Sequence, residues 1–186
     1  MDRFIPGIVK EIYCRVTFYP TLLKNVLFVG ELRRWYDRVD NRVILGALPL
    51  RRYNKQLVEE ENVRLVVTLC RSYETQLFTN SELEWGRLNV RQIHIPVMEY
   101  FGTPSVEQME YAVSAIRALD DGESAYIHCK AGRSRSATVA GSYLIETTGS
   151  TPDQAVYRLK EKRPHISLSA KQVHSLYSYY NAKHRR

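Results

Sequence analysis

The chain has 186 residues, of which 44% are hydrophobic and 25% are charged, and its formal net charge is +7. These values are ordinary for a globular protein with a real core, so they exclude a disordered chain, a collagen and a disulfide scaffold. Three cysteines without a CxxC pair argue against a disulfide framework or a thiolate zinc site. We expect neither a metal nor a cofactor.

Residues 1–30 are predicted to form an amphipathic segment, followed by one domain over residues 31–186, with the boundary near Gly30–Asp40. The segment Phe18–Pro20 is expected to interrupt the helical pattern. Such a helix can lie in a membrane interface, pack on the main core, or serve as an uncleaved mitochondrial targeting element. The apolar residues that recur at helical spacing are Ile5, Ile8, Val9, Ile12 and Val16.

From Gly30 onward the pattern alternates between strands and helices. This alternation predicts an α/β domain with a central, mostly parallel sheet flanked by helices. Predicted strands are Arg42–Leu45, Arg64–Leu69, Gln92–Val97 and Ala125–His128. Predicted helices are Ser105–Leu119, Ser134–Thr147, Asp153–Lys162 and Ala170–Lys183.

The positive charge is concentrated near the end of the sequence. Between Arg158 and Arg186 there are eight Lys and Arg residues and one acid, Glu161, while the rest of the chain is balanced. A basic C-terminal face would suit an anionic membrane, a phosphorylated substrate or a nucleic acid. A solvated helix face is the alternative.

The segment from Ala125 to Ser136 carries the chemistry. A β-rich run ends at Cys129, five residues follow, and Arg135 opens a helix. Backbone N–H groups of such a loop, together with a helix N-terminus, form an anion site, and Gly132 permits the left-handed turn. A thiol in that field has a pKa of about 3.5–7.5, against about 8.5 when free.

Each residue of this loop can be given a role. Cys129 is predicted to be the nucleophile that forms a phosphocysteine, and Arg135 to bind the phosphoryl oxygens in a bidentate way. Ser136 can hydrogen-bond the leaving thiolate, while His128 is expected to shape the loop. The phosphate-binding set is Lys130, Ala131, Gly132, Arg133, Ser134 and Arg135, with Lys130 and Arg133 placed at the pocket rim.

The motif His128-Cys129-x5-Arg135-Ser136 resembles the signature of the cysteine-based protein tyrosine phosphatases, particularly their small dual-specificity branch. Further runs resemble the mitochondrial members that hydrolyse phosphatidylglycerophosphate, among them Phe18–Leu23, Trp35–Asp40, Leu45–Arg51, Glu61–Arg64 and Tyr73–Thr75. This resemblance implies an enzyme on the matrix side of the inner mitochondrial membrane. Its product would be phosphatidylglycerol, the precursor of cardiolipin.

One departure from the family concerns the general acid. The resemblance implies an Asp on a mobile loop before the cysteine, but the matching stretch, Pro96–Pro104, has only Glu99, thirty residues before Cys129. A glutamic acid can protonate the departing alkoxide if the loop retreats by one methylene. Otherwise Glu99 is an exposed loop charge and solvent supplies the proton.

Other residues are expected to support the site. The stretch Arg163–Ser167 with Gln172 resembles the segment that backs the phosphate loop in this branch. Tyr73, Glu74 and Gln76 are placed on a loop at the carboxyl edge of the sheet, either lining the substrate mouth or lying on the surface. Cys70 is expected to be a buried small hydrophobe.

The sequence therefore predicts a monomeric phosphatase with a phospholipid substrate, an anionic membrane surface as partner and no nucleic acid. Two alternatives remain open at this point. One is a dual-specificity protein phosphatase acting on phosphotyrosine, phosphoserine and phosphothreonine. The other is a weakly active phosphoinositide-binding module, which the missing Asp would permit.

Overall fold

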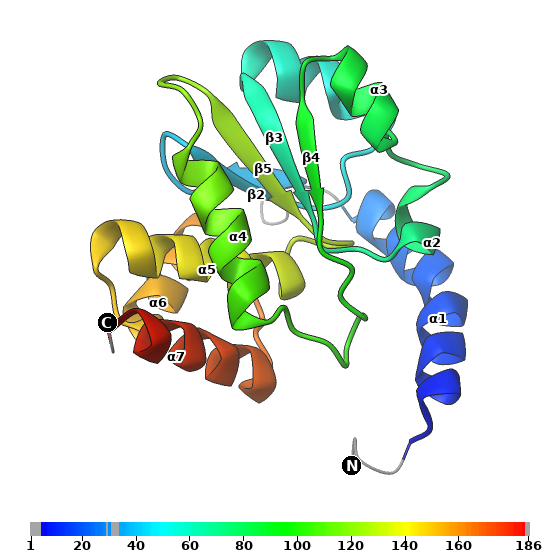
Figure 1. The fold of residues 1–186 in the computed structure, drawn as a ribbon. Coiled ribbons are helices and arrows are strands. Elements are labelled where there is room, and N and C mark those ends of the chain that lie inside the picture. The colour runs from blue at the N-terminus through cyan, green and yellow to red at the C-terminus, as the bar shows by residue number, and fades with distance from the viewer. Residues whose placement is uncertain (1–4, 29, 31–33, 185–186) are drawn as a thin grey trace.

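A five-stranded sheet forms the centre of the protein in the computed structural model, which describes residues 5–28, 30 and 34–184 (Figure 1). The strands are ordered β1-β2-β5-β3-β4, and only the β1–β2 pair is antiparallel. The predicted α/β fold is confirmed. Strand bounds are β1 Tyr36–Arg38, β2 Val43–Gly46, β3 Val63–Thr68, β4 Arg91–His94 and β5 Ser124–His128.

Alternating side chains on the central strands divide the core in two. Leu65 and Val67 enter the large core on the side of the long helices, whereas Val66 between them enters a smaller core with Trp85. This is the two-residue period of a strand that is buried on both faces. The helices are α2 Ser72–Thr75, α3 Glu82–Arg87, α4 Val106–Arg117, α5 Arg135–Thr148, α6 Pro152–Lys162 and α7 Ala170–His184, with short turns at Arg51–Tyr53 and Gln56–Glu60.

The long predicted elements are present within a few residues at each end. The predicted start of a helix was accurate where a capping residue marks it. Ser105 caps α4, and Thr151 caps α6 ahead of Pro152. Short elements were missed, namely β1, α2 and α3. These elements of three to six residues lack an apolar run such as the one in β2, so no periodicity could be recognised.

Helix α1 (Gly7–Leu27) corrects the prediction of a break at Phe18–Pro20, because the helix continues through Pro20. Proline leaves the carbonyl of Val16 without its helical partner. Val16 is exposed, so water can take that place. On the opposite side, Phe18 and Leu22 are buried in the large core, and this packing holds the two halves in one helix.

The outward face of α1 is apolar. Its exposed residues include Ile8, Val9, Ile12 and Val16, the stripe that the sequence pattern singled out. The helix thus packs on the core by one side and presents a second apolar side to solvent. Within the described residues, no helix is long and apolar enough to cross a bilayer. Whether the predicted boundary near Gly30–Asp40 separates two units stays a prediction, since residues 31–33 lie outside the described ranges.

Two of the cations near the end of the sequence are paired with acids from other parts of the fold. Arg163 is fully buried and pairs with Asp37 at 2.6 Å. Lys183 pairs with Glu110 at 2.6 Å and with Glu146 at 3.1 Å. Two of the eight cations are therefore paired, and Arg185 and Arg186 lie outside the described residues, so a basic C-terminal face stays a prediction.

The packing of α1 can be tested by its effect on stability. We expect Phe18→Ala to lower the free energy of unfolding by about 3–5 kcal/mol, because a fully buried ring would leave a cavity. Val16→Ala on the exposed side of the same helix should change it by no more than about 0.5 kcal/mol. Urea denaturation of both variants gives the comparison. An effect of Phe18→Ala as small as that of Val16→Ala would contradict the packing.

Candidate active site

The loop Cys129–Ser134 joins the end of β5 to the start of α5 at the carboxyl edge of the parallel strands. Gly132 has a φ of +65°, and a Cβ at this position would lie 2.4 Å from the backbone of Gly46. No other residue fits there without displacing the neighbouring strand. The predicted loop, with a left-handed glycine at its turn, is what the structure contains.

Arg163 holds the loop from behind. Its guanidinium donates to the carbonyls of Gly132 at 2.8 Å and Ala131 at 3.1 Å. Because these carbonyls face Arg163, the N–H groups on the other side of the same peptides face the opposite way, toward the hollow of the loop. An anion would be bound there by backbone donors.

The rest of the segment Arg163–Ser167 also backs the loop, as the resemblance implied. Ser167 N–H donates to the carbonyl of Arg133 at 3.0 Å, and the Arg133 side chain donates to the carbonyl of His165 at 2.9 Å. The Arg133 side chain thus contacts this segment, and its place at the pocket rim stays a prediction. The side chain of Gln172 instead caps α7 by accepting from Ser169 N–H at 2.9 Å.

Cys129 is 3% exposed, and the Ser136 hydroxyl donates to its sulfur at 3.2 Å. Burial of the Cys129 thiol raises its pKa. The positive charge of Arg135 and the hydrogen bond from the Ser136 hydroxyl lower it. Backbone N–H groups of Ser136 and Arg133 act in the same direction. The net result is that the pKa of the Cys129 thiol is lowered below its ordinary value.

His128 lies on the buried side of the strand end. Its Nε2 and the Thr68 hydroxyl are 2.9 Å apart, and Nδ1 lies 3.3 Å from the carbonyl of Cys129. Burial lowers the pKa of the His128 imidazole to about 3, so the ring is neutral near neutral pH. The position fits the expectation of a residue that shapes the loop, and not a proton shuttle.

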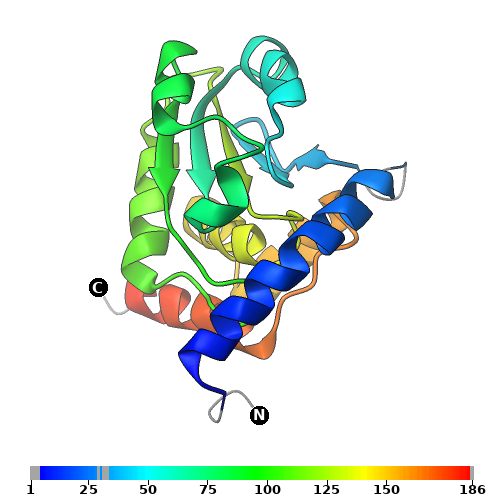
Figure 2. The same cartoon turned by 90° about the vertical axis from the view of Figure 1, so that its right-hand side faces the viewer.

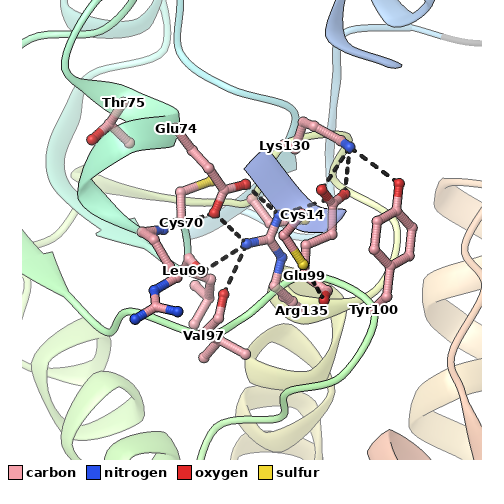
Figure 3. A network of polar contacts seen from close by, with 12 residues as sticks. Cys14, Leu69, Cys70, Glu74, Thr75, Val97, Glu99, Tyr100, Lys130 and Arg135 are labelled. Carbon is pink, nitrogen blue, oxygen red and sulfur yellow. Dashed lines mark hydrogen bonds and ion pairs between the residues drawn. The ribbon is translucent and has the colours of Figure 1, made fainter. Parts of the chain in front are cut away.

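Arg135 is bound by a carboxylate that the sequence analysis misplaced. Glu74 is fully buried on the short helix α2, not on the expected loop, and its two oxygens each accept from Arg135 at 2.8 Å (Figure 3). The same guanidinium donates to the carbonyls of Val97 at 2.9 Å and Leu69 at 3.3 Å. The sequence could have indicated this partner, because an arginine at the buried edge of a sheet needs a carboxylate to pair with.

Glu99 lies inside the site. Both of its carboxylate oxygens are 2.6 Å from the ammonium of Lys130, and one is 3.7 Å from the guanidinium of Arg135 (Figure 3). Its side chain is 12% exposed, so it is not the exposed loop charge of the alternative interpretation. To protonate a leaving group, the Glu99 carboxyl must give up its contact with Lys130 and contact the leaving oxygen instead.

Lys130 is not at the pocket rim, which corrects the sequence-based placement. It is 3% exposed and donates to the Thr21 hydroxyl of α1 at 2.6 Å. Its ammonium also lies 5.9 Å from the centre of the Phe18 ring. The amphipathic helix therefore supplies two of the partners of this buried cation, beside Glu99, and no local sequence pattern could indicate that contact.

Helix α1 lies across the phosphate loop (Figure 2). Its Cys14 thiol donates to the carbonyl of Glu99 at 3.3 Å, and its Glu11 pairs with Arg71 beside α2. Tyr73 of α2 packs edge-on against the Phe18 ring, with centroids 6.0 Å apart. Tyr73 is thus part of the contact between α1 and α2 at the side of the site.

This geometry defines the class of protein. A buried thiol of lowered pKa lies beside inward-facing backbone donors and an oriented arginine, a combination that can bind a phosphoryl group and attack it. The family model described as dual specificity phosphatase, catalytic domain, matches residues 51–182. The chain belongs to this family and is a cysteine-dependent phosphatase that hydrolyses phosphoric monoesters.

Individual relatives cover most of the chain. It is 41% identical over 172 residues to phosphatidylglycerophosphatase and protein-tyrosine phosphatase 1 of Homo sapiens, with 89% of this chain and 85% of that protein aligned. Phosphatidylglycerophosphate phosphatase PTPMT1 of Arabidopsis thaliana is 35% identical over 173 residues, which cover 91% of this chain and 50% of that protein. The crystal structure of PTPMT1 in complex with PI(5)P matches with a TM-score of 0.79 at 36% identity, covering 82% of this chain and 99% of that chain.

The Ser136 hydroxyl gives a test of how the site lowers the pKa of Cys129. We expect Ser136→Ala to raise that pKa by about one unit or more, because the thiolate loses a hydrogen bond worth about 1.5–3 kcal/mol. Alkylation by iodoacetamide, measured against pH, should therefore shift to higher pH in the variant. An unshifted profile would show that the hydroxyl does not stabilise the thiolate.

Proposed function

We propose that this phosphatase removes the terminal phosphate of phosphatidylglycerophosphate and releases phosphatidylglycerol. One observation carries the proposal: the helix that lies over the phosphate loop presents an apolar outer face, including Ile8, Ile12 and Val16. A helix of this kind enters the boundary between head groups and acyl chains of a membrane. It would place the loop at the depth of a lipid phosphate. The names of the relatives point to the same lipid.

In the proposed reaction, the Cys129 thiolate attacks phosphorus and the bond to the lipid oxygen breaks, giving a phosphocysteine. Loop N–H groups and Arg135 hold the three equatorial oxygens, and Glu99 gives its proton to the departing alkoxide. Water then attacks the phosphocysteine, phosphate leaves, and the thiolate returns to its hydrogen bond with Ser136. Glu99 accepts the proton of that water, so the enzyme is restored.

A second candidate is a protein-tyrosine phosphatase, because the animal relatives are named for both activities. The phosphate loop and its supporting residues would be the same for both substrates. The difference lies in what surrounds the loop. An apolar helix above it favours a lipid over a polar peptide, whose N–H and C=O groups would need partners there.

We extend the proposal to the surroundings of the enzyme: an anionic membrane surface, on the matrix side of the inner mitochondrial membrane, in the route to cardiolipin. Lys10, Arg15 and Lys24 on α1, against one acid, Glu11, support attraction to anionic lipid. Protease protection of the tagged chain in isolated mitochondria tests the location. Recovery of the chain outside mitochondria would contradict it.

A substrate panel tests the lipid activity directly. Phosphate release is measured from phosphatidylglycerophosphate, a phosphatidylinositol phosphate, and phosphotyrosine and phosphothreonine peptides in the same detergent, with Cys129→Ser as the blank. We expect the highest kcat/KM with phosphatidylglycerophosphate. A higher value for the phosphotyrosine peptide would favour the second candidate, and binding of the phosphoinositide without turnover of any substrate would contradict both.

The role of Glu99 is tested by changing the leaving group. Glu99→Gln should lower kcat for the lipid substrate by about 10²–10⁴-fold, because its alkoxide must be protonated as it leaves. An aryl phosphate with a weakly basic leaving group needs little protonation, so its kcat should change far less. Steady-state kinetics with both substrates measures the contrast. Equal losses would show that Glu99 positions Lys130 or the loop and is not the acid.

A further inference from the structure

An apolar groove of about 560 Å³ runs along the side of α1 that faces Leu50 and Phe78. No charged side chain lines it, and its one side-chain polar group is the hydroxyl of Tyr19. Leu23 in its wall is 58% exposed, so the groove is open to solvent. Other lining residues are Leu22 and Val26 of α1. Exposed apolar surface that forms a hollow is typical of a binding site.

The groove lies close to the phosphate site, and a short series of aromatic rings packs between the two. The Phe78 ring at its wall lies 6.2 Å from the Tyr19 ring and 6.3 Å from the Phe18 ring. The Phe18 ring in turn lies 5.9 Å from the ammonium of Lys130, the residue next to Cys129. One aromatic side chain thus separates the groove from the loop that holds the phosphate.

We propose that this groove binds an acyl chain of the phospholipid whose phosphate occupies the loop. The proposal rests on the lipid activity proposed above and adds to it a site for the hydrocarbon part of the substrate. A peptide in the groove would leave backbone N–H and C=O groups without partners, because the lining offers a single hydroxyl. An acyl chain has no such groups, so its burial carries no polar cost.

This occupant predicts a dependence on chain length. Each methylene that enters the groove should raise kcat/KM by up to about fourfold, until the groove is full. The substrates are dibutanoyl, dihexanoyl and dioctanoyl phosphatidylglycerophosphate, used with the full chain below their micelle concentrations so that no membrane takes part. The readout is the ratio of kcat/KM between the longest and the shortest chain, measured within one variant.

The test compares two leucines on the same helix. Leu23→Gln places an amide in the wall of the groove and should reduce the chain-length ratio toward one. Leu27→Gln is the matched control: Leu27 is four residues further on and 68% exposed, and it does not line the groove. The Leu27→Gln variant should keep the same ratio of kcat/KM between long and short acyl chains as the unmodified protein. Both leucines are largely exposed, so neither variant is expected to impair folding.

The outcomes separate the two proposals. No chain-length dependence in the unmodified chain would overturn the groove while leaving the lipid activity standing. The same holds if Leu23→Gln keeps the full ratio, or if Leu27→Gln loses as much. If no lipid of any length is hydrolysed while a phosphotyrosine peptide is, the proposed lipid function itself fails, and the groove proposal falls with it.

Discussion

The buried ion pair between Arg135 and Glu74 is the constraint on which the site depends. A guanidinium in this position has lost its water, and it is stable only because a carboxylate and two carbonyls replace that water. Those partners come from α2 and from the segments that follow β3 and β4. Arg135 therefore ties the start of α5 to three neighbouring parts of the fold, and the loop before it is fixed at its end.

The phosphate loop is held by two buried arginines with different tasks. Arg163 binds its carbonyls from behind and so turns its N–H groups inward. Arg135 follows the loop at the start of α5, and its positive charge lowers the pKa of the Cys129 thiol. Helix α1 then covers this assembly with one side and faces solvent with another, both largely apolar. In the proposed function, the first side of α1 packs against the protein core and the second side contacts the lipid.

Local sequence patterns were sufficient for the parallel strands β2 to β5, the helices α4 to α7 and the loop, because each depends on neighbours within a few residues. The contacts that complete the site depend on residues far apart in the chain. Glu74 meets Arg135 across 61 positions, and Thr21 meets Lys130 across 109. Pro20 shows the same limit: its effect on α1 was judged from local geometry, but packing of Phe18 and Leu22 keeps the helix continuous.

The most direct test of this account is the affinity for tungstate, a phosphate analogue, in the unmodified chain and in Glu74→Gln. The substitution removes a negative charge beside the anion site, so charge alone predicts tighter binding. If Glu74 instead orients Arg135, binding should weaken by about tenfold or more, the equivalent of one lost hydrogen bond to a charged group. Titration calorimetry measures the tungstate affinity of both proteins and decides between these two expectations. The urea midpoint of each protein verifies that it is folded. Unchanged or tighter binding would contradict the account.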